Sequence, residues 1–235
     1  MNENLKDALK GDTAILADEL QQETVYLAGM RSAYETLYCR QESVDLLNRT
    51  DNGLFHLLRV VLYREMILSV CKLLDSASQG RFQNATLSQL QERLKKDGHE
   101  DASKRLAESL PCLNDKHQPF RNMRRKSIAH SDYDLAVGKV VLPDAERLRL
   151  VDLIDGIGKA LNSVRDTLGV RPLELSLGVL PVPGESLLQV LRTFMLRLDA
   201  EHEAFLSSGD AQAMNQNDSD SDAGIDDEET PEMVA

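Results

Sequence analysis

The chain has 235 residues, of which 42% are hydrophobic and 28% charged, and its formal net charge is −12. This length and apolar content suffice for the core of one large or two small domains, and no apolar run is long enough to span a bilayer. Sparse aromatic residues, the absence of Trp and short β-branched runs predict an all-α fold.

Most of the negative charge lies at the C-terminal end. Residues 207–235 contain nine acidic residues, no Lys or Arg, and almost no large apolar side chains. Without this segment the formal charge is −3, so the rest of the chain is nearly neutral. We therefore expect a helical domain over residues 1–206 and a disordered acidic tail over residues 207–235.

The cysteine pattern favours a cytoplasmic protein without a metal. Cys39, Cys71 and Cys112 are widely spaced, no CxxC or HxxxH pairing is present, and the opening MNENLKDALK is polar rather than signal-like. We expect reduced thiols, no zinc site and no membrane association. The sequence also lacks a GxxxxGK[ST] loop and a GxSxG elbow, so no nucleotide cofactor and no serine hydrolase are expected.

Hydrophobic spacing predicts helices along most of the chain. Residues 54–74 are apolar nearly all round, which is typical of a central buried helix; Arg64 and Glu65 interrupt it, and they either sit at an edge or face a polar groove. Thr86 and Gln89 form a capping-box pattern at a helix start. The expected elements are a fraying segment 2–10, helix 12–38 capped by Asp12 or Thr13, a short helix 42–47, turn 48–53, helix 54–74, loop 75–85, helix 87–98, helix 101–110 ending before Pro111, a basic helix starting near Pro119, a strand-like run 138–142, helix 143–168, a connector 169–184 and a last helix 187–198.

A basic segment stands out in this acidic chain. From Lys116 to Ser131 there are five Lys or Arg, two His and no Asp or Glu. Arg125 is a permanent cation that binds phosphate oxygens in pairs, and His130 can exchange a proton near neutral pH. On a regular α-helix, residues five apart point about 140° apart, so the two side chains converge only at a helix end or if the Arg curls around. The plainer alternative is a solvated basic helix that His130 caps.

The run Arg125-Lys126-Ser127-Ile128-Ala129-His130-Ser131-Asp132 resembles the RNKxxAHxD signature of HEPN-domain proteins. The wider chain is similar to the abortive-infection HEPN family of AbiU type over roughly residues 16–168. In that family a buried helix precedes a second helix, and the Arg/His helix follows. The end of the buried helix resembles residues 72–75 (KLLD) of this chain, and the start of the second helix resembles residues 86–90 (TLSQL). Lys126 stands where the signature usually has Asn, and Asp132 where some HEPN toxins have Tyr.

The resemblance implies an up-and-down helical bundle that forms a homodimer and acts as a metal-independent endoribonuclease in phage defence. If the roles of the family's signature residues apply to this chain, Arg125 would bind the phosphate and His130 would be the acid or base. Arg124 would be the alternative to Arg125 for binding the phosphate. Arg121, Arg124 and Lys126 would contact the RNA, and an antitoxin or another defence protein would be a partner. The alternatives are a non-catalytic module that binds RNA or a nucleotide, and a protein-interaction scaffold.

Overall fold

The structure, a computed structural model, describes residues 4–128, 147–175 and 184–207. Within these ranges it is helical apart from one very short strand pair, which confirms the all-α class. The expected strand 138–142 and all of the acidic tail except Ser207 lie outside the described residues. Contacts divide the chain into two units, Met1–Leu188 and Gln189–Ala235, which are treated separately below.

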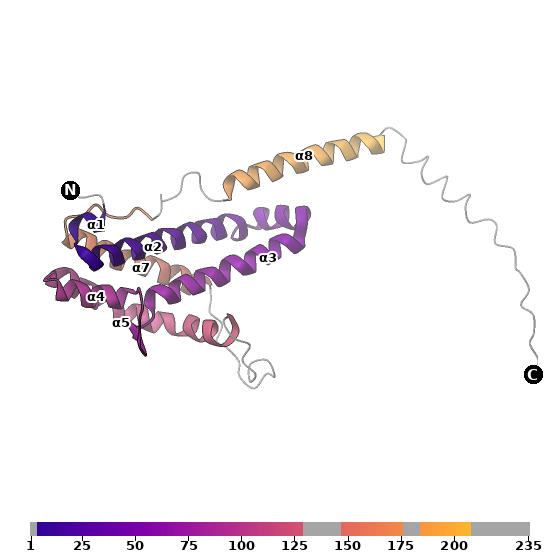
Figure 1. Ribbon diagram of the computed structural model, residues 1–235. Coiled ribbons are helices and arrows are strands. Elements are labelled where there is room, and N and C mark those ends of the chain that lie inside the picture. Colours follow the sequence, from indigo (N-terminus) through magenta and orange to yellow (C-terminus); the bar gives the residue numbers. More distant parts are fainter. Residues whose placement is uncertain (1–3, 129–146, 176–183, 208–235) are drawn as a thin grey trace, which may run out of the picture. The chain divides into compact units, whose positions relative to one another are not determined.

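The described elements follow one another along the chain as labelled in Figure 1. They are α1 (Leu5–Ala8), α2 (Gly11–Tyr38), α3 (Gln41–Leu74), β1 (Ser78–Gln79), β2 (Phe82–Gln83), α4 (Leu87–Lys96), α5 (Glu100–Met123), the π-helix η1 (Arg124–Ile128), α7 (Arg147–Thr167) and α8 (Glu185–Ser207). Strands β1 and β2 form a small antiparallel ladder in which Ser78 pairs with Gln83.

The first two long helices form a hairpin in which α3 turns back along α2 (Figure 1). Helix α3 is kinked at Asp51, whose backbone is extended at φ −162° and ψ 93°. The Leu54 amide donates to Asp51 Oδ1 at 2.9 Å, so Asp51 caps the second half of the helix. The turn expected at residues 48–53 is therefore present as a kink between two helical pieces.

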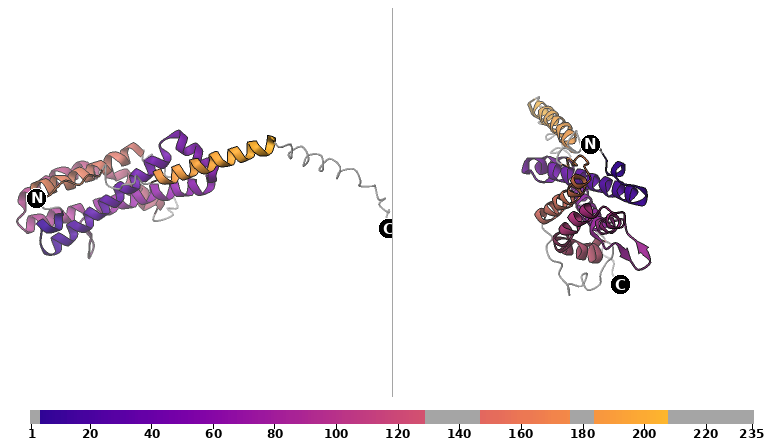
Figure 2. Two further views of the ribbon diagram at one scale, coloured as in Figure 1. Left: turned by 90° about the horizontal axis from the view of Figure 1, so that it is seen from above. Right: turned by 90° about the vertical axis from the view of Figure 1, so that its left-hand side faces the viewer.

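The core of the first unit lies where α5 packs against α7 and α4, and where α2 packs against α3. Figures 1 and 2 both place α7 between α2 and α5, in agreement with its contacts to both helices. Leu5 and Leu9 are buried in this core, so the expectation that residues 2–10 fray is wrong for the described part of that segment. Two apolar side chains four residues apart are enough to hold one helical turn against the bundle.

Helix α5 differs most from expectation, because it continues through Pro111 and Pro119. Two separate helices were predicted, since an internal proline removes one backbone hydrogen bond and crowds the preceding turn. Pro111 is exposed, where water can bind the carbonyl that it leaves without a partner. On the opposite face Leu113 and Phe120 are buried, and their packing holds the helix together.

The second half of α3 is not buried all round. Leu54, Leu57 and Val61 are more than half exposed, which corrects the prediction of a central buried helix. They follow the spacing i, i+3, i+7 and form one apolar stripe along the helix. The buried face begins at Phe55 and becomes complete only near the C-terminal end.

Several predicted boundaries are confirmed. Helix α2 ends at Tyr38, and Thr86 Oγ1 accepts a hydrogen bond from the Gln89 amide at the start of α4. The N-cap of α2 is Lys10 rather than Asp12 or Thr13. Helix α8 begins in the first unit, where Leu188 is buried, and continues to Ser207 in the second unit.

Candidate functional site

The basic segment spans the end of α5 and the π-helix η1 that follows directly. In a π-helix the backbone hydrogen bond joins residues five apart instead of four. Such segments are rare in proteins, and many of those that occur lie at functional sites. Residues five apart then lie closer to one face than in an α-helix. The expected α-helical basic segment is thus wound as a π-helix from Arg124 to Ile128.

Arg124 connects this segment to the end of α3. Its Nη1 lies 2.5 Å from Asp75 Oδ2, and the two side chains are 27% and 19% exposed. Burial disfavours the charged guanidinium, but the hydrogen bond and charge of Asp75 outweigh it and raise the pKa of Arg124. The ion pair therefore fixes the first residue of η1 to the neighbouring helix.

A buried polar pair lies beneath this ion pair. His117 Nε2 lies 3.3 Å from Cys71 Sγ, and both side chains are at most 2% exposed. Burial lowers the pKa of His117 to about 4 and raises the pKa of the Cys71 thiol to about 12. At neutral pH both groups are uncharged, so this pair is a poor nucleophile and base, and we interpret it as packing.

Three residues predicted to bind phosphate or RNA lie on the surface of this segment. Arg121 and Arg125 are exposed, and Lys126 is half-exposed. His130 lies outside the described residues, so the structure does not place it relative to Arg125. What the structure brings together is Arg124 and Asp75, with exposed Arg125 next in the chain.

Sequence reasoning missed a cationic hollow next to η1. It has a volume of about 450 Å³ and is lined by α2, α3 and the segment from Met123 to Ile128. Arg64 lines it, which favours the second of the two interpretations of that residue, whereas Glu65 does not. The available signal was the spacing i, i+3, i+7, i+8 of His56, Arg59, Tyr63 and Arg64.

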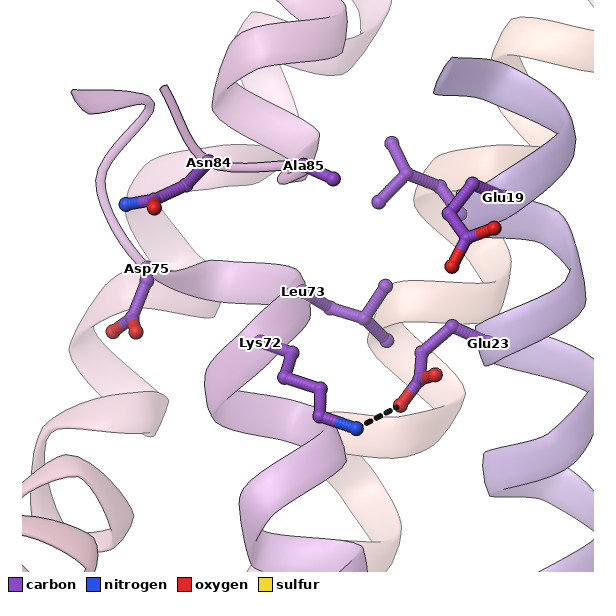
Figure 3. A pocket seen from close by; sticks show the side chains of 8 residues that line it. Glu19, Glu23, Lys72, Leu73, Asp75, Asn84 and Ala85 are labelled. Carbon is purple, nitrogen blue, oxygen red and sulfur yellow. Dashed lines mark ion pairs between the residues drawn. The ribbon is translucent and has the colours of Figure 1, made fainter. Parts of the chain in front are cut away.

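A second hollow, of about 280 Å³, lies between α2 and the end of α3 and is unsuited to a phosphate (Figure 3). Glu19 and Glu23 line it, and Glu23 Oε1 lies 3.5 Å from Lys72 Nζ. Figure 3 shows Asp75 at the end of α3, with its carboxylate directed away from the Lys72–Glu23 pair. Carboxylates repel an anion, so of these two hollows the one beside η1 is the better suited to an anionic ligand.

Two other kinds of site are absent from the described residues. Among residues 4–128, 147–175 and 184–207, no three His, Cys, Asp or Glu side chains are grouped to hold a metal ion. In the same ranges, no helix combines the length and apolar character needed to cross a membrane.

The sequence of the chain matches a known protein family. A family model described as AbiU2, of the HEPN class, matches residues 14–172. No curated protein and no solved structure matches the chain. The matched range begins in α2 and includes the whole of the basic segment.

Proposed function

The chain belongs to the AbiU2 family of HEPN domains, and from this premise we propose that it is a metal-independent endoribonuclease acting in phage defence. Arg125 binds the phosphate at the cleaved bond, and His130 exchanges protons with the reacting oxygens. Arg121 and Lys126 supply positive charge along the RNA backbone, whereas Arg124, which was expected to contact the RNA, is paired with Asp75 and holds the segment in place. In this proposal two copies of the chain combine their basic segments at one groove.

The reaction needs an acid, a base and positive charge, but no metal. The RNA 2′-hydroxyl attacks the adjacent phosphorus while a base removes its proton, and the bond to the 5′-oxygen breaks as an acid protonates that oxygen. The products are a 2′,3′-cyclic phosphate and a free 5′-hydroxyl. A guanidinium stabilises the crowded phosphate through two parallel hydrogen bonds. One His per chain gives both the acid and the base only when two chains meet.

The observation that carries this proposal is the exposed Arg125 on a π-helix whose first residue is tied down. The Arg124–Asp75 ion pair at 2.5 Å limits the motion of η1, so a phosphate meets a cation that is already positioned. The exposed stripe of Leu54, Leu57 and Val61 supports self-association, because an uncovered apolar row on a helix is a common contact surface.

Purified protein incubated with RNA in EDTA tests the proposal. We expect fragments ending in 2′,3′-cyclic phosphate, and a loss of rate of at least about 100-fold for His130→Ala and for Arg125→Ala. Arg105→Ala is the matched control, since Arg105 is an exposed cation on α5 outside the basic segment, and it should cleave normally. Undiminished cleavage by His130→Ala would falsify the acid–base role.

Lys126 favours one alternative, because it stands where the HEPN signature usually has Asn. Under that alternative the same surface binds RNA without cutting it. The EDTA experiment then yields salt-dependent binding and no product, since phosphate contacts weaken as salt rises.

A further inference from the structure

One face of α3 forms a wall of the hollow beside η1. Its lining residues lie at spacing i, i+3, i+4, i+7 and i+8, which places them on a single helical face: His56, Arg59, Val60, Tyr63 and Arg64. Tyr34 of α2 forms a second wall, and Met123 and Ile128 form the third. The volume of about 450 Å³ lies within the range of pockets that hold small organic ligands.

The charge of this hollow is opposite to that of the whole protein. Two guanidinium groups, Arg59 and Arg64, and one imidazole, His56, line it, and no Asp or Glu is among its described lining residues. In a chain with a formal net charge of −12 this local cationic set selects an anion. A guanidinium prefers a planar, multi-oxygen anion such as phosphate.

Aromatic rings give the same hollow a second kind of contact. The rings of Tyr34 and Tyr63 are 6.1 Å apart at a tilt of 42°. Arg59 Nε donates to Tyr34 Oη at 3.4 Å, which holds the guanidinium at the wall and leaves the two Nη groups as donors for a ligand. Because Tyr34 is buried, the ring available to a ligand is that of Tyr63, and a ring beside a held guanidinium suits a nucleotide, whose base stacks while its phosphate is bound.

The position of the hollow relates it to the proposed cleavage site. Met123 and Ile128 flank Arg125 in the sequence, and both line the hollow. His130 follows Ile128 by two residues in the chain. A nucleotide bound here therefore lies against Met123 and Ile128, the two described residues that flank Arg125 in the chain.

We propose that the hollow between α2, α3 and η1 is an RNA subsite, in which Arg59 and Arg64 bind a phosphate and Tyr63 stacks on the base of a nucleotide next to the cleaved bond. This inference rests on the proposed function for its substrate. It adds residues from α3, which lie outside the Arg/His signature, to the RNA contacts.

Binding of a short single-stranded RNA tests the subsite separately from cleavage. We use the His130→Ala protein as background, so that the RNA stays intact, and measure Kd by fluorescence anisotropy at several salt concentrations. Arg64→Ala should raise Kd about tenfold and reduce the slope of log K against log salt by about one. Arg105→Ala is again the matched control, an exposed Arg on α5 that should leave Kd unchanged.

The base contact needs its own variants. Tyr63→Leu should raise Kd about fivefold or more, and Tyr63→Phe, which keeps the ring, should restore it. An RNA that lacks the base of the nucleotide bound in the subsite should bind the Tyr63→Leu variant and the protein with Tyr63 with the same Kd. Thermal unfolding of each variant shows whether a weaker Kd reflects a damaged fold, and the Phe variant keeps the test valid if Leu does not fold.

The outcomes separate the two proposals. If the wild-type protein cleaves RNA but the Arg64 and Tyr63 variants bind RNA with the same Kd as their controls, the subsite proposal is wrong and the nuclease assignment stands. If wild type does not cleave but binding depends on Arg64 and Tyr63, the subsite stands and the nuclease assignment fails. Equal affinity for free AMP and for the oligonucleotide would overturn the RNA assignment in favour of a mononucleotide site.

Discussion

The Arg124–Asp75 ion pair offers the sharpest test of how the basic segment is held. Asp75→Asn keeps the shape of the side chain and removes its charge. Exposed ion pairs contribute about 0.2–1 kcal/mol, and breaking a buried pair costs about 3–5 kcal/mol. With side chains 19% and 27% exposed, this pair lies between these limits. Asp75 Oδ1 is buried without a hydrogen-bond partner among the described residues, which offsets part of the gain. We expect a loss of about 2 kcal/mol.

Urea unfolding followed by circular dichroism measures this loss, and a double-mutant cycle with Arg124→Gln assigns it to the pair. We expect a coupling energy of about 1 kcal/mol or more. The control is Glu174→Gln, which breaks the pair with Arg171 at 3.6 Å, where both side chains are more than half exposed. That change should cost less than about 1 kcal/mol. Equal losses for Asp75→Asn and Glu174→Gln, or no coupling with Arg124, would refute the reasoning.

Three further predictions concern the helices that carry the site. The pKa of His117 is lowered to about 4 in the folded state, so below pH 6.5 the unfolded state binds the extra proton. The free energy of unfolding should fall by roughly 3 kcal/mol in all as the pH drops from about 6.5 to 4. In the His117→Gln variant the free energy of unfolding should depend less on pH in that window. The buried Cys71 should resist a thiol reagent at pH 8 until urea is added, while the two exposed cysteines react at once. A Cβ at Gly156 would come within 2.7 Å of Leu113 Cδ2, whereas one at Gly53 meets its nearest neighbour at 3.5 Å. Gly156→Ala should therefore lower the free energy of unfolding by about 1–3 kcal/mol, and Gly53→Ala should leave that free energy equal or higher.

The sequence predicted those elements whose signals are local. The end of α2 at Tyr38 follows from helical spacing, and the Thr86–Gln89 cap follows from one side chain meeting one nearby amide. Charge composition alone identified the basic segment, and family resemblance supplied the roles expected of its residues, because a short motif names residues without requiring their contacts.

Elements decided by distant contacts were not predictable from local signals. Proline chemistry argues for a break at Pro111 and at Pro119, and only the packing of α5 on α7 and α4 overrides it. A run of apolar residues does not show which face is covered, so Leu57 was expected inside and lies exposed. The cationic hollow depends on three helices that are far apart in the sequence, and its α3 face alone did not identify it.

The π-helical segment also constrains how this chain can change over time. A π-turn accommodates one more residue than the α-turn it replaces, so removing a residue between Arg124 and Ile128 would let α5 continue with ordinary winding. Ordinary winding places successive residues about 100° apart, so the side chains between Arg124 and Ile128 would change direction together. Substitutions in this stretch alter one contact at a time, whereas a single-codon deletion would redirect the side chains of η1 as a group. Related chains should therefore vary here in residue type and keep the same spacing.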